Sequence, residues 1–183
     1  MENSSLKGKI KSVARVRSKS PIMAGIVASM GSAPAAQPGD MVPDFTARNQ
    51  DGRPVSLSEF RGHPVLIYFY PKDDTPGCTQ EACQFRDEYS KFKKHGCAIL
   101  GISRQDEKSH RKFHSKYHLP FDLLVDADGS IAKKLGVKTV PVLGFHHRQS
   151  MLIGPEGQVI KFYGEVDPRT HTRDVLDDLD AEI

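Results

Sequence analysis

The sequence predicts an α/β domain in which helices flank a central mixed β-sheet, and this domain occupies residues 40–183. Short apolar runs rich in strand formers, such as 65–70 and 97–102, indicate buried strands. Segments with apolar residues at helical spacing separate them, an alternation typical of α/β layer architectures. Two later strands joined by the turn at 155–157 add a hairpin before a closing helix.

Local signals justify each element in turn. Asp51-Gly52 marks the turn of a first hairpin with Phe45 as its apolar anchor, and Gly96 ends the first long helix. In chain order we expect this hairpin, a helical turn capped by Ser56 or Ser58 and ending at Gly62, a strand at 65–70, a helix containing Cys78 and running to about Lys94, a strand at 97–102, a helix at 106–117, a strand region at 119–125, a short helix at 130–135, strands at 149–153 and 158–163, and a helix at 170–179.

Composition limits the possible functions. Residues 1–39 carry six Lys and Arg against the single acid Glu2, whereas residues 40–183 carry 20 basic and 22 acidic side chains. The folded part therefore gives no general case for nucleic-acid binding. Three cysteines, an odd number, argue against a secreted disulfide scaffold. No apolar stretch is long enough for a transmembrane helix, so we expect no membrane partner.

The N-terminal segment, residues 1–39, is expected to be disordered and is excluded from the fold. Residues 6–20 are rich in Lys, Arg and Ser without an acid, 21–30 are weakly apolar, and 31–36 are small. Three interpretations remain open: a plastid or mitochondrial transit peptide, an export signal cleaved near Ala35 or Ala36, or an uncleaved tail on a cytoplasmic protein. A nucleic-acid-binding arm is disfavoured because no aromatic residues interleave with the basic ones.

The stretch from Tyr70 to Cys83 carries the candidate chemistry. A buried strand ends here and a helix begins, with Thr75 as N-cap and Pro76 at the first helical position. Cys78 then lies in the first turn, where free backbone N–H groups and the helix dipole favour an anion. The thiolate, which is the reactive form of cysteine, is the anion that this residue can form.

Cys83 follows five residues later. In a helix, the Cα atoms of Cys78 and Cys83 would be roughly 8.7 Å apart and their side chains about 140° apart. A disulfide requires Cα atoms within about 7 Å, so these cysteines can join only if the first helical turns unwind. A permanent structural disulfide is disfavoured, and a transient one formed by local unfolding is the alternative.

These residues resemble a known family. Pro71-x3-Thr75-x2-Cys78 matches the active-site pattern of peroxiredoxins, and the string YPKDDTPGCTQEACQFRD from Tyr70 to Asp87 resembles their Q branch, also called bacterioferritin comigratory protein. The resemblance implies a thioredoxin-like fold across residues 40–183. It also implies a thiol-dependent peroxidase without a cofactor or metal, acting on hydrogen peroxide and organic hydroperoxides in antioxidant defence.

The resemblance also implies residue roles. Cys78 would be the peroxidatic cysteine that becomes a sulfenic acid, and Cys83 the resolving cysteine in an intramolecular disulfide that thioredoxin or a similar dithiol reduces. The Thr75 hydroxyl and the N–H groups of Gly77 and Cys78 would hold the reacting atoms, and Pro71 would shield the thiol. Arg148, at the start of a late strand, would lie near Cys78. An intramolecular pair needs no second subunit, so a monomer is expected.

Two departures from the family pattern bear on Arg148. The loop Lys138 to His147 differs from the expected pattern, and Gly154 stands where the family often has an acid. Periodicity in the sequence does not place Arg148 beside Cys78.

Other candidates are weaker. His110, His114 and His118 recur every four residues and could present metal ligands, but we favour a solvated helix face because no acid supports them. Cys97 is expected to be a core residue. A thiol–disulfide oxidoreductase would need a C-x2-C pair. A redox sensor or holdase, in which the disulfide switches a binding surface, remains open as a second activity.

Overall fold

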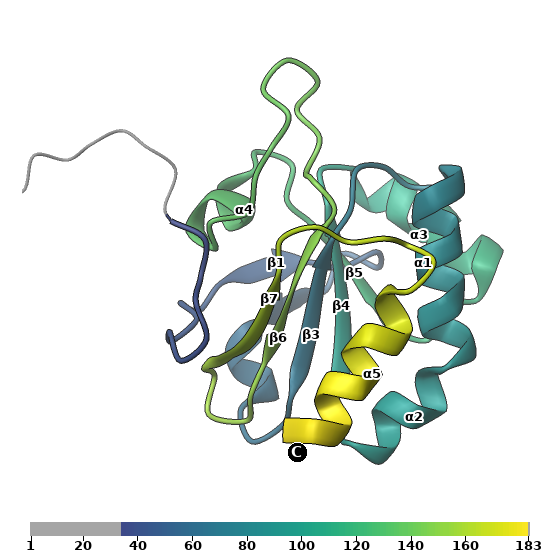
Figure 1. Ribbon diagram of the computed structural model, residues 1–183. Helices are drawn as coiled ribbons and strands as arrows, with labels where there is room; N and C mark the ends of the chain where they lie inside the picture. Colours follow the sequence, from purple (N-terminus) through teal and green to yellow (C-terminus); the bar gives the residue numbers. More distant parts are fainter. Residues whose placement is uncertain (1–33, 183) are drawn as a thin grey trace, which may run out of the picture. The chain divides into compact units, whose positions relative to one another are not determined.

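A computed structural model describes residues 34–182 (Figure 1). The elements in chain order are β1 (Thr46–Arg48), β2 (Pro54–Ser56), the 3-10 helix η1 (Leu57–Phe60), β3 (Val65–Phe69), α1 (Pro76–Asp87), α2 (Tyr89–Lys94), β4 (Ala98–Ser103), α3 (Glu107–Tyr117), β5 (Asp122–Val125), α4 (Ser130–Lys134), β6 (Gln149–Ile153), β7 (Val159–Tyr163) and α5 (His171–Glu182). No helix among these residues is long and apolar enough to cross a membrane.

The main sheet has five strands in the order β5-β4-β3-β6-β7. Strands β3, β4 and β5 are parallel, whereas β6 pairs antiparallel with both β3 and β7. Strands β1 and β2 form a separate antiparallel hairpin. The predicted mixed sheet flanked by helices is therefore confirmed.

Both faces of the central strand β3 are buried. Val65, Ile67 and Phe69 pack with the hairpin, η1 and α4 on one face of the sheet. The alternate residues, Leu66 and Tyr68, pack with α1, α2, α3 and α5 on the other face (Figure 1). This two-sided burial explains the continuous apolar run in the sequence. Burial of β3 also fixes the position of its carboxyl end, and the candidate site lies next to this end.

The structure differs from two expectations about element bounds. The single helix expected to run to Lys94 is interrupted at Glu88, whose φ of −97° and ψ of 8° are not helical, so that α1 and α2 are separate. Residues 34–39, expected to belong to the N-terminal segment, contact the domain. The Gly39 N–H donates to the Val159 carbonyl at 2.8 Å, and Ala36 packs on the core. The remaining expectations for that segment concern residues 1–33, outside the described part of the chain.

One glycine shows how closely this entry segment approaches the domain. Gly136 has a φ of +71°, and a Cβ there would lie 2.5 Å from the Pro34 carbonyl oxygen. Only glycine combines this backbone conformation with so close an approach. Residues 34–39 are therefore part of the packed unit.

Candidate active site

Cys78 lies in the first turn of α1, directly beyond the carboxyl end of β3. Thr75 occupies the N-cap position with extended backbone angles, and Pro76 is the first helical residue. The Thr75 hydroxyl does not cap the helix; its Oγ1 donates to the Lys72 carbonyl at 2.9 Å. Pro71 lies in the same connection, immediately after the buried Tyr70. The Cys78 side chain itself is buried, and the thiol is free.

The structure brings Arg148 to the Cys78 sulfur. Arg148 immediately precedes β6, whose first residue, Gln149, pairs with Phe69 at the end of β3. The register places Arg148 at the same edge of the sheet as the start of α1, and its Nη2 donates to Cys78 Sγ at 3.2 Å. At Gly77 a Cβ would lie 3.2 Å from this Nη2, so glycine leaves room for the guanidinium.

The charge of Arg148 is secure although the residue is partly buried. Burial lowers the pKa of Arg148, but the nearby Glu81 and Cys78 raise it, and the net shift is upward. Arginine is already protonated at any physiological pH. The group facing Cys78 is therefore a permanent cation, which favours the thiolate over the thiol.

A row of buried polar side chains contacts Arg148 through Nη1, the nitrogen that does not donate to Cys78. Arg148 Nη1 donates to Glu81 Oε2, and the other oxygen of Glu81 lies 2.7 Å from His171 Nδ1. His171 Nε2 lies 2.6 Å from Ser150 Oγ. Glu81 is fully buried, so these contacts replace its hydration. This buried chain links α1, β6 and α5 and fixes the position of the guanidinium.

Sequence reasoning missed this chain. It assigns no role to Glu81, His171 or Ser150. Glu81 and His171 lie 90 residues apart, and neither belongs to the pattern that identified Cys78. The only sequence signal was the i, i+3 spacing of Cys78 and Glu81, which puts both side chains on one face of α1.

Cys83 is half-buried and free, one and a half turns after Cys78 in the same helix. The two cysteines therefore have the helical separation expected from their spacing, and no disulfide joins them here.

Cys97 lies at the other end of the sheet. It precedes β4, whose first residue pairs with Val65 at the start of β3. The five residues of β3, at about 3.3 Å each, separate this level from the end where Cys78 lies. Cys97 Sγ donates to the Ala98 carbonyl at 3.4 Å, and burial raises the pKa of this thiol to about 12. Cys97 is a buried core residue.

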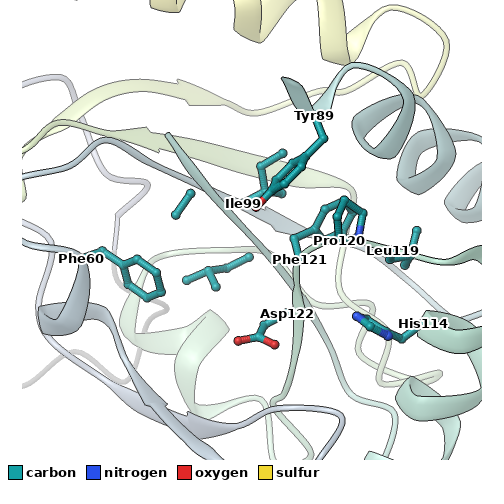
Figure 2. Close-up of a pocket in the computed structure, with 10 residues that line it drawn as sticks. Phe60, Tyr89, Ile99, His114, Leu119, Pro120, Phe121 and Asp122 are labelled. Carbon is teal, nitrogen blue, oxygen red and sulfur yellow. The ribbon is translucent and has the colours of Figure 1, made fainter. Parts of the chain in front are cut away.

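A surface pocket of about 390 Å³ opens at this same end, beside the starts of β4 and β5 (Figure 2). Phe60, Tyr89, Ile99 and Phe121 supply much of its apolar lining. None of the expected site residues lines it, so the pocket is separate from the Cys78 site.

The three histidines on α3 have different environments, and the interpretation as a solvated face is wrong for His110. His110 is fully buried, with Nδ1 2.9 Å from Asp73 and Nε2 3.1 Å from the Leu124 carbonyl. His114 borders the pocket in Figure 2, and His118 ends the helix with a φ of +51°. Within residues 34–182 there is no group of three or more His, Cys, Asp or Glu side chains placed to hold a metal.

The chain is similar to known proteins in sequence. The model of the AhpC/TSA family matches residues 38–162. A chloroplastic peroxiredoxin Q from Oryza sativa subsp. japonica is 46% identical over 139 residues, which are 75% of this chain and 64% of the rice protein. The chain thus spans somewhat less than two thirds of that relative's length.

Solved structures also match. The peroxidoxin BcpB of Mycobacterium tuberculosis is 32% identical, with a TM-score of 0.76 over 81% of this chain and 99% of that protein. A bacterioferritin comigratory protein from Xanthomonas campestris is 34% identical, with a TM-score of 0.69 over 75% of this chain and 90% of that protein. The domain therefore has the thioredoxin-like fold expected from the sequence.

Proposed function

Because the chain belongs to the AhpC/TSA family, and its relatives include peroxiredoxins Q, we propose that it is a thiol-dependent peroxidase. One observation carries the proposal: the guanidinium of Arg148 lies 3.2 Å from the sulfur of Cys78, which is in the first turn of a helix. A cation and a helix N-terminus converge on one thiol. This arrangement favours the thiolate and supplies donors for an oxygen that becomes negative during attack.

In the first step the Cys78 thiolate attacks the terminal oxygen of a hydroperoxide. The S–O bond forms as the O–O bond breaks, a proton is taken up by the leaving oxygen, and the products are a Cys78 sulfenic acid and water or an alcohol. Arg148 stabilises the charge that moves onto oxygen, and the N–H groups of Gly77 and Cys78 add donors. Pro71 limits the access of water. The Thr75 hydroxyl donates its hydrogen bond to the Lys72 carbonyl, so its oxygen is left with lone pairs that can accept from the peroxide.

In the second step Cys83 attacks the Cys78 sulfenic acid, forming a disulfide and releasing water. This step requires unwinding of the first turns of α1, because the helical separation is too large for a bond. Cys83 is favoured over Cys97 because Cys97 lies at the far end of the sheet, with its thiol held protonated. An external dithiol, thioredoxin by family resemblance, then reduces the disulfide by exchange.

The experiment that tests the proposal is a mass measurement after one equivalent of hydrogen peroxide, with free thiols then blocked and peptides mapped. A loss of two hydrogens in a Cys78–Cys83 bridge, reversed by thioredoxin, is expected. Oxidation confined to Cys78 with Cys83 still blockable would assign resolution to another thiol, and an unreacted Cys78 would overturn the peroxidase proposal.

A Cys83→Ser variant separates the two steps. It should retain a single fast reaction with peroxide and lose thioredoxin-linked turnover, because the sulfenic acid then has no partner in the helix. If the first reaction were lost to the same extent as in Cys78→Ser, the assigned roles would be wrong.

Substrate, assembly and compartment extend the proposal. The bacterioferritin comigratory protein of Xanthomonas campestris is described as having an alkyl peroxide reduction activity, which supports including organic hydroperoxides here. A monomer is sufficient for an intramolecular disulfide, and light scattering on the reduced protein tests it. The rice relative is chloroplastic, which favours a plastid transit peptide for residues 1–36. Cleavage after residue 36 would remove Pro34 and Ala36 from their contacts with the domain. A fluorescent fusion of these residues that stays in the cytosol would contradict that location.

A further inference from the structure

Helix α3 contacts the loop that leads into the Cys78 helix through a buried carboxylate. Asp73 is buried, and three side chains converge on it. The Tyr70 hydroxyl donates to Oδ1 at 2.7 Å, and the Ser109 hydroxyl donates to Oδ2 at 2.7 Å. His110 Nδ1 lies 2.9 Å from Oδ2. None of these contacts involves the peroxide chemistry proposed above.

The hydrogen bonds of His110 identify where its protons are. Its Nε2 lies 3.1 Å from the Leu124 carbonyl oxygen, which can only accept, so Nε2 carries a proton. Nδ1 faces an Asp73 oxygen that already accepts from Ser109, so this contact also needs a proton between the two atoms. Burial and the charge of Asp73 raise the pKa of Tyr70, which keeps the phenol a donor. One proton therefore lies between His110 Nδ1 and Asp73, in a buried hydrogen bond that completes the contacts of both side chains.

The next residue is held by the other end of α3. Asp74 has a φ of +56°, a left-handed conformation that is uncommon outside glycine. Lys116 Nζ donates to both Asp74 oxygens at 2.9 and 2.8 Å, and the Tyr117 hydroxyl donates at 2.6 Å. We call these contacts of Ser109, His110, Lys116 and Tyr117 with Asp73 and Asp74 the α3 clamp. Its buried half is stronger, because exposed pairs such as Lys116–Asp74 contribute little.

The α3 clamp lies on the segment that must move for the second chemical step. Ala82 and Phe85, on the downstream side of Cys78, are fully buried in the core and anchor the rest of α1. Releasing Cys78 therefore costs least if the first turn and the residues before it detach together. Residues 75–77 have their nearest upstream anchor at Asp73 and Asp74.

We propose that His110 is a positioning residue, whose buried hydrogen bond with Asp73 holds the loop before Cys78 and sets how often the first turn of α1 unwinds. The inference rests on the proposed function and deepens it. When unwinding is a fast equilibrium, the rate of disulfide formation is proportional to the unwound fraction. A competing reaction consumes the folded sulfenic acid: a second hydroperoxide adds its oxygen to give a sulfinic acid and releases water or an alcohol. The clamp therefore sets the ratio of recycling to overoxidation.

The test compares His110→Asn with the matched control His114→Asn, one turn along the same helix. Histidine and asparagine have similar helix propensities, and His114 makes no contact with Asp73. Amide hydrogen exchange is measured on the reduced protein. His110→Asn should raise exchange in residues 76–83 at least tenfold and leave β6 and α5 unchanged. His114→Asn should stay within twofold of the wild type throughout.

A milder variant, Ser109→Ala, tests the proposal if His110→Asn does not fold. It removes one donor to Asp73 and retains the contact between His110 and Asp73. Its exchange in residues 76–83 should rise by a smaller factor, about threefold. In each variant, disulfide formation after a peroxide pulse should accelerate by the same factor as exchange. The peroxide concentration that half-converts Cys78 to the sulfinic acid should rise by that factor too.

Three results would overturn the inference: unchanged exchange at 76–83 in both clamp variants, a uniform rise over the whole domain, or faster exchange without faster disulfide formation. The exchange measurement requires no peroxide. A wild-type protein that does not react with peroxide would therefore end the proposed function, while the effect of His110 on unwinding would still be decided.

Discussion

Cys78 and Cys97 are buried to almost the same extent, with 2% and 3% of their surfaces exposed, yet their surroundings are opposite. Cys78 faces a guanidinium at 3.2 Å and the free N–H groups of a helix N-terminus. Cys97 Sγ donates to the Ala98 carbonyl at 3.4 Å, and burial raises the pKa of this thiol to about 12 although a backbone contact with Leu66 opposes the shift. Equal burial therefore accompanies different surroundings: a cation and a helix N-terminus lie beside Cys78, whereas Cys97 lies at the start of a core strand.

The largest expected contrast between the two sites comes from removing each sulfur. Cys78→Ser should abolish peroxide turnover, because a serine hydroxyl neither ionises near neutral pH nor forms a sulfenic acid. Cys97→Ala should retain the rate of the first peroxide reaction within twofold. Stopped-flow peroxide consumption measures both, and comparable losses in the two variants would contradict the assignment.

The second contrast is in alkaline stability. The ordinary pKa of 9.0 applies to Cys97 in the unfolded chain, whereas the folded protein holds this proton up to about pH 12. Between these pH values the folded state binds more protons, so the free energy of unfolding falls as pH rises. Three pH units at about 1.4 kcal/mol each give a decrease of up to about 4 kcal/mol.

Urea unfolding of the wild type and Cys97→Ala at pH 8.5 and pH 11 isolates this contribution, because other titrating groups are common to both. The stability advantage of the wild type should shrink with rising pH. A gap between the two proteins that stays constant with pH would show that the Cys97 thiol does not titrate as described.

The third contrast tests the cation. Arg148→Met keeps the side-chain length and removes the charge next to Cys78, and the second-order rate with peroxide should fall about 100-fold, equivalent to about 2.7 kcal/mol. Arg173→Met, on the exposed surface of α5, is the control and should change the rate less than twofold. An effect of Arg148→Met below threefold would mean that the guanidinium contact is not used in the reaction.

The smallest expected effect concerns the far end of the buried chain. Ser150→Ala removes the hydroxyl that contacts His171, and loses about 1 kcal/mol of hydrogen bonding. The peroxide rate should fall no more than about fivefold. Thr172→Val is the control, because the neighbouring Thr172 hydroxyl has no hydrogen-bond partner among residues 34–182. Equal rates for both variants would show that the Ser150 hydroxyl does not affect the peroxide rate, and that only Glu81 and His171 support Arg148.

The local signals in the sequence predicted much of the fold and singled out Cys78 as the candidate reactive residue. The apolar run at Val65 predicted a buried strand, and Thr75-Pro76 predicted the start of α1. Both signals are local, because strand patterns and helix caps depend on residues close together in the sequence. These two signals together placed Cys78 at a helix N-terminus. Family resemblance, rather than periodicity, pointed to Arg148.

Only the tertiary structure decided what surrounds Cys78. The chain Arg148–Glu81–His171–Ser150 joins side chains from α1, α5 and the start of β6, and no local pattern encodes such contacts. His110 shows the same limit: its sequence neighbours Ser109 and Arg111 are polar, and its polar contacts depend on Asp73 and β5. Sequence periodicity reports which face of a helix is apolar on average, whereas a buried polar pair is defined by the partner that the fold brings to it.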